Sequence, residues 1–138
     1  MNLSASPLQE LDLSFYGIDN LVYIKRDDLI HDVISGNKWR KLKYNLQHFQ
    51  SISKHGIVSM GGAFSSHILA LSYICNEYKI PCTLLVRGEP SFPVNNILKQ
   101  CLSFNARIKY INRENYKDSL WINTLVNESF KDFYFIPE

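Results

Sequence analysis

The sequence predicts an α/β fold in which a parallel sheet is covered by helices on both faces. Short, nearly continuous apolar segments alternate with longer segments whose apolar residues recur at helical spacing. Such apolar runs are typical of strands buried between two layers of helices. The expected strands are 57–60, 83–86, 107–111 and 133–136, and the expected helices are 38–53, 68–78, 94–104 and 115–130. Ligands bind such sheets beyond the carboxyl ends of strands, so we expect a site in the loops after residues 60 and 86.

The chain before the first helix does not follow this alternation. Residues 1–20 are expected to form an irregular arm, because Pro7 and Gly17 interrupt any regular pattern. Residues 21–25 alternate well enough to form a strand, which we expect to stand apart from the main sheet. The Arg-Asp-Asp run at 26–28 is compatible with a turn that holds a local ion pair.

The helix at 38–53 begins with a polar turn. Asn37 is a candidate N-cap, because its side-chain oxygen can accept a hydrogen bond from the open N–H groups of the first turn. Gly56 is expected to end the helix. One face is apolar and consists of Trp39, Leu42, Leu46 and Phe49.

Lys38 occupies the first turn of that helix. The positive end of the helix dipole and the charges of Arg40 and Lys41 disfavour its ammonium form. A lysine that deprotonates easily is a candidate for Schiff-base chemistry with a carbonyl compound. The alternative is an ordinary solvated lysine at a helix start.

The loop between the first expected strand and the second helix is the other candidate for chemistry. Gly61 and Gly62 let the backbone approach a ligand closely. Ser65 or Ser66 can cap the helix, whose N-terminus offers free N–H groups to an anion. Ser65 could also exchange a proton with a substrate or attack it, if a neutral amine stands close. The alternative is a plain turn with serine caps, in which His67 is a polar surface residue.

The later helices have mixed faces. In the helix at 94–104 the residues expected to face inward are Ile97, Leu98, Cys101 and Leu102. The helix at 115–130 carries Leu120, Trp121, Leu125 and Val126.

Composition narrows the function classes. The 138 residues suit one domain, and a net charge of +2 gives no argument for a nucleic acid or a membrane surface as partner. Cys75, Cys82 and Cys101 are odd in number and lack metal-ligand spacing, so we expect buried, reduced thiols and no metal site. The polar N-terminus shows no secretory signal and no apolar run reaches membrane-spanning length, which makes the cytoplasm the expected location.

Four stretches together resemble the pyridoxal-phosphate family of 1-aminocyclopropane-1-carboxylate deaminase and D-cysteine desulfhydrase. The similarity extends from about Leu21 to Glu138, and its stretches are Lys25–Leu29, Gly36–Leu42, Gly61–His67 and Val86–Glu89. The resemblance implies the tryptophan-synthase β-subunit fold, in which the cofactor lies between two α/β domains. It implies that residues 1–35 form an arm and strand of the larger domain, and that 36–138 form the smaller domain. It also implies a homo-oligomer that acts on a small amino acid.

The resemblance further implies roles for individual residues. Lys38 matches the lysine to which pyridoxal 5'-phosphate is attached, with Asn37 and Arg40 in support. Ser65 matches a catalytic serine over the cofactor ring, with a role in proton transfer or nucleophilic attack. The segment that receives the substrate carboxylate consists of Ser65, Ser66 and His67.

The sequence departs from the family in two respects. Ser66 stands where the family usually has an asparagine that donates to the phenolic oxygen of the cofactor, and a serine side chain is shorter. Members of the family also continue beyond the point matched by Tyr134–Glu138, with a glycine-rich loop for the cofactor phosphate, the partner of the pyridine nitrogen and active-site tyrosines. This sequence has no glycine after Gly88, so we expect it to match the N-terminal part of such an enzyme.

Three function classes stay open at this stage. The first is a pyridoxal-phosphate deaminase or desulfhydrase, between which the sequence does not choose. The second is a truncated, inactive α/β domain of that family. The third is a Rossmann-type nucleotide-binding module, against which the absence of a Gly-x-Gly-x-x-Gly motif counts.

Overall fold

The computed structural model of the chain describes residues 3–34, 36–90 and 93–138, and its main sheet is parallel as predicted. The strand order is β5-β4-β3-β6, where the strands are β3 (Gly56–Gly62), β4 (Cys82–Arg87), β5 (Arg107–Ile111) and β6 (Phe133–Ile136). The predicted strands at 107–111 and 133–136 match β5 and β6 residue for residue, while β3 and β4 extend slightly beyond the predicted bounds.

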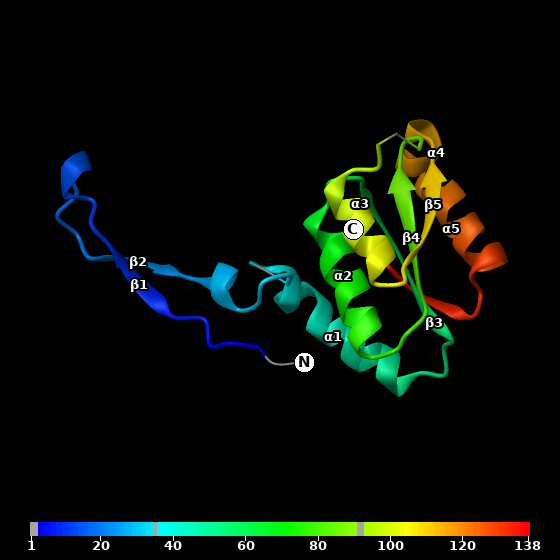
Figure 1. Ribbon diagram of the computed structural model, residues 1–138, viewed down its shortest axis with the longest axis horizontal. Helices are drawn as coiled ribbons and strands as arrows, with labels where there is room; N and C mark the ends of the chain where they lie inside the picture. Colours follow the sequence, from blue (N-terminus) through cyan, green and yellow to red (C-terminus); the bar gives the residue numbers. More distant parts are fainter. Residues whose placement is uncertain (1–2, 35, 91–92) are drawn as a thin grey trace.

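Helices cover both faces of this sheet, which confirms the predicted three-layer α/β class (Figure 1). The alternation in β4 shows the two layers. Leu84 and Val86 are buried on one face, under α1 (Lys38–Ser51), α2 (Ser66–Glu77) and α3 (Asn96–Ser103). Leu85 is buried on the other face, under α4 (Arg113–Lys117) and α5 (Ser119–Ser129).

The path of the chain creates a switch point between two strands. From β3 the chain moves outward through β4 to β5, and then returns across the sheet to place β6 on the other side of β3. The chain that leaves β3 near Gly62 therefore runs toward β4, whereas β6 lies on the opposite side of β3 and has its carboxyl end at Ile136. In open α/β sheets this is where a crevice for ligands forms.

The last predicted helix is divided into two helices. The helix predicted at 115–130 consists of α4 and α5, which are separated at Asp118. Asp118 has extended backbone angles, and its carboxylate accepts hydrogen bonds from the N–H groups of Leu120 and Trp121. It starts a new helix at a point where the apolar spacing is continuous.

The predicted roles of Gly56 and Leu102 are also wrong. α1 ends at Ser51 because Ile52 is extended, and Gly56 instead begins β3. A Cβ atom on Gly56 would lie 2.5 Å from the carbonyl oxygen of Pro81, so glycine lets β3 pass close to the segment that leads into β4. In α3, Leu98 and Cys101 are buried as predicted, whereas the side chain of Leu102 is 49% exposed.

The N-terminal arm is more regular than predicted. β1 (Leu8–Leu11) pairs antiparallel with β2 (Val22–Lys25) in a separate hairpin that extends away from the main body (Figure 1). Short 3-10 turns lie at Ser14–Tyr16 and Asp27–Leu29. The predicted strand at 21–25 is thus present and stands apart from the main sheet. Residues 1, 2 and 35 of this predicted arm lie outside the described residues, and its assignment to a larger domain stays a prediction.

The hairpin exposes many apolar side chains. The exposed set in the arm is Leu8, Phe15, Tyr16, Ile18, Leu21, Tyr23 and Ile24. Over the ranges that the structure covers, no helix is both long and apolar enough to cross a membrane.

Candidate active site

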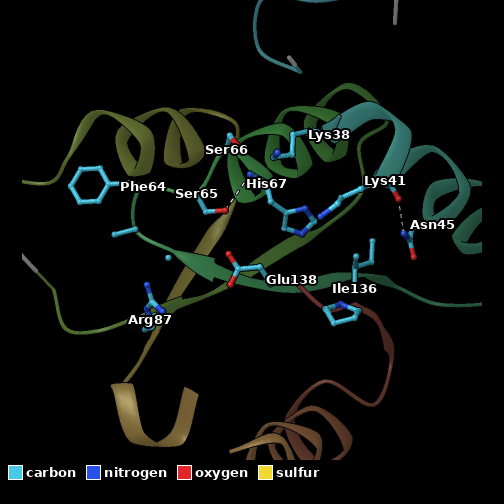
Figure 2. Close-up of a pocket in the computed structure, with 13 residues that line it drawn as sticks. Lys38, Lys41, Asn45, Phe64, Ser65, Ser66, His67, Arg87, Ile136 and Glu138 are labelled. Carbon is cyan, nitrogen blue, oxygen red and sulfur yellow. Dashed lines mark hydrogen bonds between the residues drawn. The ribbon is translucent and has the colours of Figure 1, made fainter. Parts of the chain in front are cut away.

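A cavity of about 750 Å³ lies at the switch point between β3 and β6. Figure 2 shows side chains that enter it from the start of α1, from the turn between β3 and α2, and from the segment after β6. Lys38 and Ser65 both line this cavity, together with Ser66 and His67. Two helix starts that are 28 positions apart in the sequence therefore converge on one space large enough for a small organic ligand.

Lys38 is the first residue of α1, and its position is set by the turn before it. Gly36 has a φ of +62°, a left-handed conformation that glycine adopts readily, and its N–H donates to the carbonyl oxygen of Asp27 at 2.9 Å. Asn37 occupies the N-cap position as predicted, but its side chain makes no capping hydrogen bond. Instead its Oδ1 accepts a hydrogen bond from Lys38 Nζ at 2.6 Å. Asn37 thus holds the ammonium group, in place of capping the helix.

Arg40 does not line the cavity. Its guanidinium donates to both carboxylate oxygens of Asp27, at 2.5 and 2.8 Å. The hydroxyl of Ser6 donates to the same carboxylate at 2.6 Å. Hydrogen bonds from Arg40 and then Ser6 hold the pKa of Asp27 well below its usual range. Arg40 therefore ties α1 to the N-terminal arm, a role that its sequence position did not indicate.

The turn between β3 and α2 depends on a close approach at Gly61. A Cβ atom there would lie 2.5 Å from Ile68 Cγ2 and 3.2 Å from the Ser65 side chain. Gly61 is therefore needed for α2 to pack on β3. The second glycine, Gly62, lines the cavity.

Ser65 is the N-cap of α2, one of the two serines that the sequence proposed for this role. Its Oγ accepts from the N–H of His67 at 3.2 Å, and its own N–H donates to the carbonyl oxygen of Gly62 at 2.9 Å. Of the three N–H groups expected to receive a carboxylate, two are thus engaged within the turn. The N–H of Ser66 has no partner among the described residues, which leaves it as the open donor.

His67 is buried, and the interpretation of it as a surface residue is wrong. Only 8% of it is exposed, and its Nε2 lies 3.0 Å from the hydroxyl oxygen of Ser59 in β3. That hydroxyl donates to the carbonyl oxygen of Ile136 in β6 at 2.6 Å. Burial lowers the pKa of His67 below its ordinary value of 6.5; Lys41 and Lys38 lower it further, while Glu138 acts in the opposite direction. The lowered pKa favours the neutral form of the imidazole.

Four further polar side chains line the cavity: Lys41, Asn45, Arg87 and Glu138. Arg87 belongs to the segment after residue 86, where the sequence predicts a ligand site, whereas the other three were not selected. Lys41 and Asn45 follow Lys38 by three and seven positions, so the helical period could have identified them as one face of α1. The guanidinium of Arg87 lies 5.6 Å from the ring centroid of Tyr116, whose hydroxyl donates to Glu138 at 2.7 Å. No local pattern could have indicated that contact.

The cavity combines a cationic lining with a few acceptors. Lys38, Lys41 and Arg87 carry positive charge, and Glu138 is the carboxylate of the lining. Neither ion pair found within the described ranges involves these three cations. Such an arrangement suits a ligand that bears an anionic group and reacts with an amine.

Several named proteins are similar in sequence to most of this chain. A protein of Thermotoga maritima, named as a candidate 1-aminocyclopropane-1-carboxylate deaminase, is 32% identical over 119 residues, which are 85% of this chain and 37% of that protein. The D-cysteine desulfhydrase of Serratia proteamaculans is 28% identical over 112 residues, or 77% of this chain and 34% of the relative. The chain thus spans about a third of the length of these relatives. No protein-family model matches it.

Solved structures agree with the fold. The crystal structure of an ACC deaminase homologue superposes with a TM-score of 0.74 at 26% identity, over 97% of this chain and 42% of that one. The O-acetylserine dependent cystathionine β-synthase from Helicobacter pylori superposes with a TM-score of 0.70 at 14% identity, over 97% and 44% of the two chains. These similarities confirm the expected tryptophan-synthase β-like architecture.

Proposed function

This chain is homologous to the 1-aminocyclopropane-1-carboxylate deaminase and D-cysteine desulfhydrase family, and on that premise we propose that its cavity is the lysine-bearing side of an active site that uses pyridoxal 5'-phosphate on a small amino acid. The observation that carries the proposal is the convergence of Lys38 from α1 and Ser65 from α2 on one cavity. The relatives' names include both a deaminase and a desulfhydrase, so the proposal covers both reactions.

The residues around Lys38 fit the carbonyl side of that cofactor. Lys38 supplies a primary amine at the edge of a cavity of about 750 Å³, and Asn37 fixes the position of that amine. Ser66 adds a hydroxyl group to the lining of the same cavity. Bound pyridoxal phosphate would supply an electron sink for the substrate. Arg40 contributes indirectly, by fixing the start of α1 through Asp27.

The start of α2 is suited to the substrate. The N–H of Ser66, at the positive end of the helix dipole, can donate to a carboxylate. The Ser65 hydroxyl accepts from the N–H of His67 and keeps its own proton, which it can donate to a group in the cavity. Ser65 is therefore the residue of this turn best placed to transfer a proton at its Oγ.

We propose that turnover requires an assembly that also contains the part of the family's enzymes that this chain does not match. The lining contains a single glycine, Gly62, and thus offers no glycine-rich cradle for a phosphate. The chain spans about a third of its relatives, and a cofactor held on one side lacks the orientation that catalysis needs. Homo-oligomerisation and a cytoplasmic location are part of the proposal; three free, buried cysteines support a reducing compartment.

A chimera tests the function. The matching segment of the Thermotoga maritima relative would be exchanged for residues 1–138, and the purified protein assayed with 1-aminocyclopropane-1-carboxylate and D-cysteine. We expect release of ammonia or sulfide that is lost in Lys38→Ala and retained in Lys43→Ala, since Lys43 lies on α1 outside the cavity. Activity that survives Lys38→Ala, or a folded chimera that binds the cofactor without acting on either compound, would contradict the proposal.

A further inference from the structure

Ser59, His67 and the backbone of Ile136 form a hydrogen-bond chain whose direction can be assigned. The Ser59 hydroxyl has one proton, and the carbonyl oxygen of Ile136, 2.6 Å away, can only accept it. The contact of 3.0 Å between Ser59 Oγ and His67 Nε2 must then run in the other direction, with Nε2–H as the donor. The neutral imidazole therefore carries its proton on Nε2 and a lone pair on Nδ1.

That lone pair faces the cavity. Nδ1 has no hydrogen-bond partner among the described residues. Within the described part of the chain, every side-chain nitrogen or oxygen that is fully buried does have a partner. Nδ1 is therefore accessible, and the side chain of His67 lines the cavity. Figure 2 shows the ring pointing into this space near Lys41 and Glu138.

The position of Nδ1 complements the other polar groups of the site. Lys38, Lys41 and Arg87 are donors, as is the N–H of Ser66. Asn45 Oδ1 already accepts from the hydroxyl of Tyr134 at 2.9 Å. Nδ1 and the Glu138 carboxylate, one oxygen of which accepts from Tyr116, are acceptors that a positively charged ligand group can meet.

We propose that Ser59 is a positioning residue that holds His67 as the Nε2–H tautomer, so that Nδ1 accepts a hydrogen bond from the ammonium group of an amino-acid ligand. The carboxylate of the same ligand lies at the start of α2, where it accepts from the N–H of Ser66. The ligand class rests on the proposed function, whereas the tautomer does not. Because the hydrogen-bond chain runs from Ile136 through Ser59 to His67, the orientation of the His67 imidazole also depends on the register of β6 against β3.

Nitrogen-15 NMR of the imidazole tests the tautomer in the ligand-free, 138-residue chain at pH 7. We expect Nε2 to be protonated and Nδ1 unprotonated. In Ser59→Ala the ratio of the Nδ1–H to the Nε2–H tautomer should rise about fivefold, the effect of losing one hydrogen bond. Ser72→Ala is the matched control, because Ser72 is a buried serine of α2 that donates to the Leu69 carbonyl. A proton on Nδ1 in the wild-type chain, or equal spectra for the wild type and Ser59→Ala, would overturn the proposal without touching the proposed function.

The same signals test the ligand in the chimera before pyridoxal phosphate is added, while the amino group of the ligand is still an ammonium group. We expect 1-aminocyclopropane-1-carboxylate to shift the Nδ1 resonance, and cyclopropanecarboxylate, which lacks the amino group, to shift the Ser66 amide alone. Equal effects of both compounds on Nδ1, or no effect of either, would overturn the acceptor role. If neither compound shifts any cavity resonance, the proposed function fails together with the acceptor role of Nδ1. A wrong tautomer alone refutes only the positioning role of Ser59.

Discussion

Lys38, the first residue of α1, and Ser65, the N-cap of α2, line the same cavity at the carboxyl edge of the sheet. Neither helix could place its residue there alone. α1 is anchored to the arm by Arg40 and Asp27, and α2 is anchored to β3 by the close approach at Gly61. The site thus depends on two independent structural supports, which separate substitutions can test.

The isolated chain is expected to show no turnover. With pyridoxal phosphate added, it should release no ammonia, 2-oxobutanoate or sulfide from 1-aminocyclopropane-1-carboxylate or D-cysteine, because one side of the cavity cannot orient the scissile bond. The exposed apolar residues of the arm should also promote self-association, measurable by light scattering. Turnover that is abolished by Lys38→Ala would mean that this third of the family's length is a sufficient enzyme.

Gly61→Ala is expected to reduce the free energy of unfolding by about 1–3 kcal/mol, because the new methyl group would overlap Ile68. Gly62→Ala is the control, since the nearest atom to a Cβ there, on Arg87, lies 3.5 Å away. Urea denaturation compares the two variants. A loss of stability in Gly62→Ala as large as that in Gly61→Ala would refute the close-packing explanation.

Arg40→Gln is expected to raise the pKa of Asp27 toward its ordinary value of 3.8, because the strongest hydrogen bonds to that carboxylate are lost. Carbon-13 NMR of the carboxyl group measures the titration. Arg26→Gln removes a cation that pairs with Asp28, and should leave the larger part of the Asp27 shift in place. If both substitutions affect Asp27 equally, the contact of α1 with the arm does not exist in solution.

His67 should make the protein less stable at mildly acidic pH. Burial lowers the pKa of His67 in the folded state, so the unfolded chain binds the proton more readily. The free energy of unfolding therefore falls as the pH drops through the ordinary value of 6.5, and the loss continues down to the lower pKa of the folded state. Denaturation at pH 7.5 and 5.5 measures this loss, which should be smaller in His67→Gln and unchanged in His48→Gln, an exposed histidine. Equal pH dependence in all three proteins would contradict a buried, neutral His67.

Local patterns were sufficient for much of the fold. The strand formers Ile108, Tyr110 and Ile111 predict β5 residue for residue, although β5 is an edge strand that exposes Arg107 and Lys109. The apolar run at 133–136 predicts β6 in the same way. The break at Asp118 was missed since the apolar period continues across it, while the capping carboxylate looks like any exposed aspartate of a helix.

The site was less predictable because its contacts join distant elements. Burial of His67 depends on Ser59 and on the carbonyl of Ile136, which belong to two other strands. Arg40 was linked to the cofactor by resemblance, yet its partner is Asp27 in the arm. Such long-range partners have no signal in the local sequence, whereas helix starts such as those at Lys38 and Ser66 do.

The most direct test of the central claim is to locate the residue that bonds to the cofactor. The 138-residue chain would be mixed with pyridoxal phosphate and reduced with borohydride, which makes a lysine–cofactor bond permanent, and its peptides analysed by mass spectrometry. We predict that the pyridoxyl group lies on Lys38, is absent in Lys38→Ala and is retained in Lys43→Ala. A label on Lys41 instead, or one spread evenly over the surface lysines, would contradict the assignment of this cavity as the lysine-bearing side of an active site.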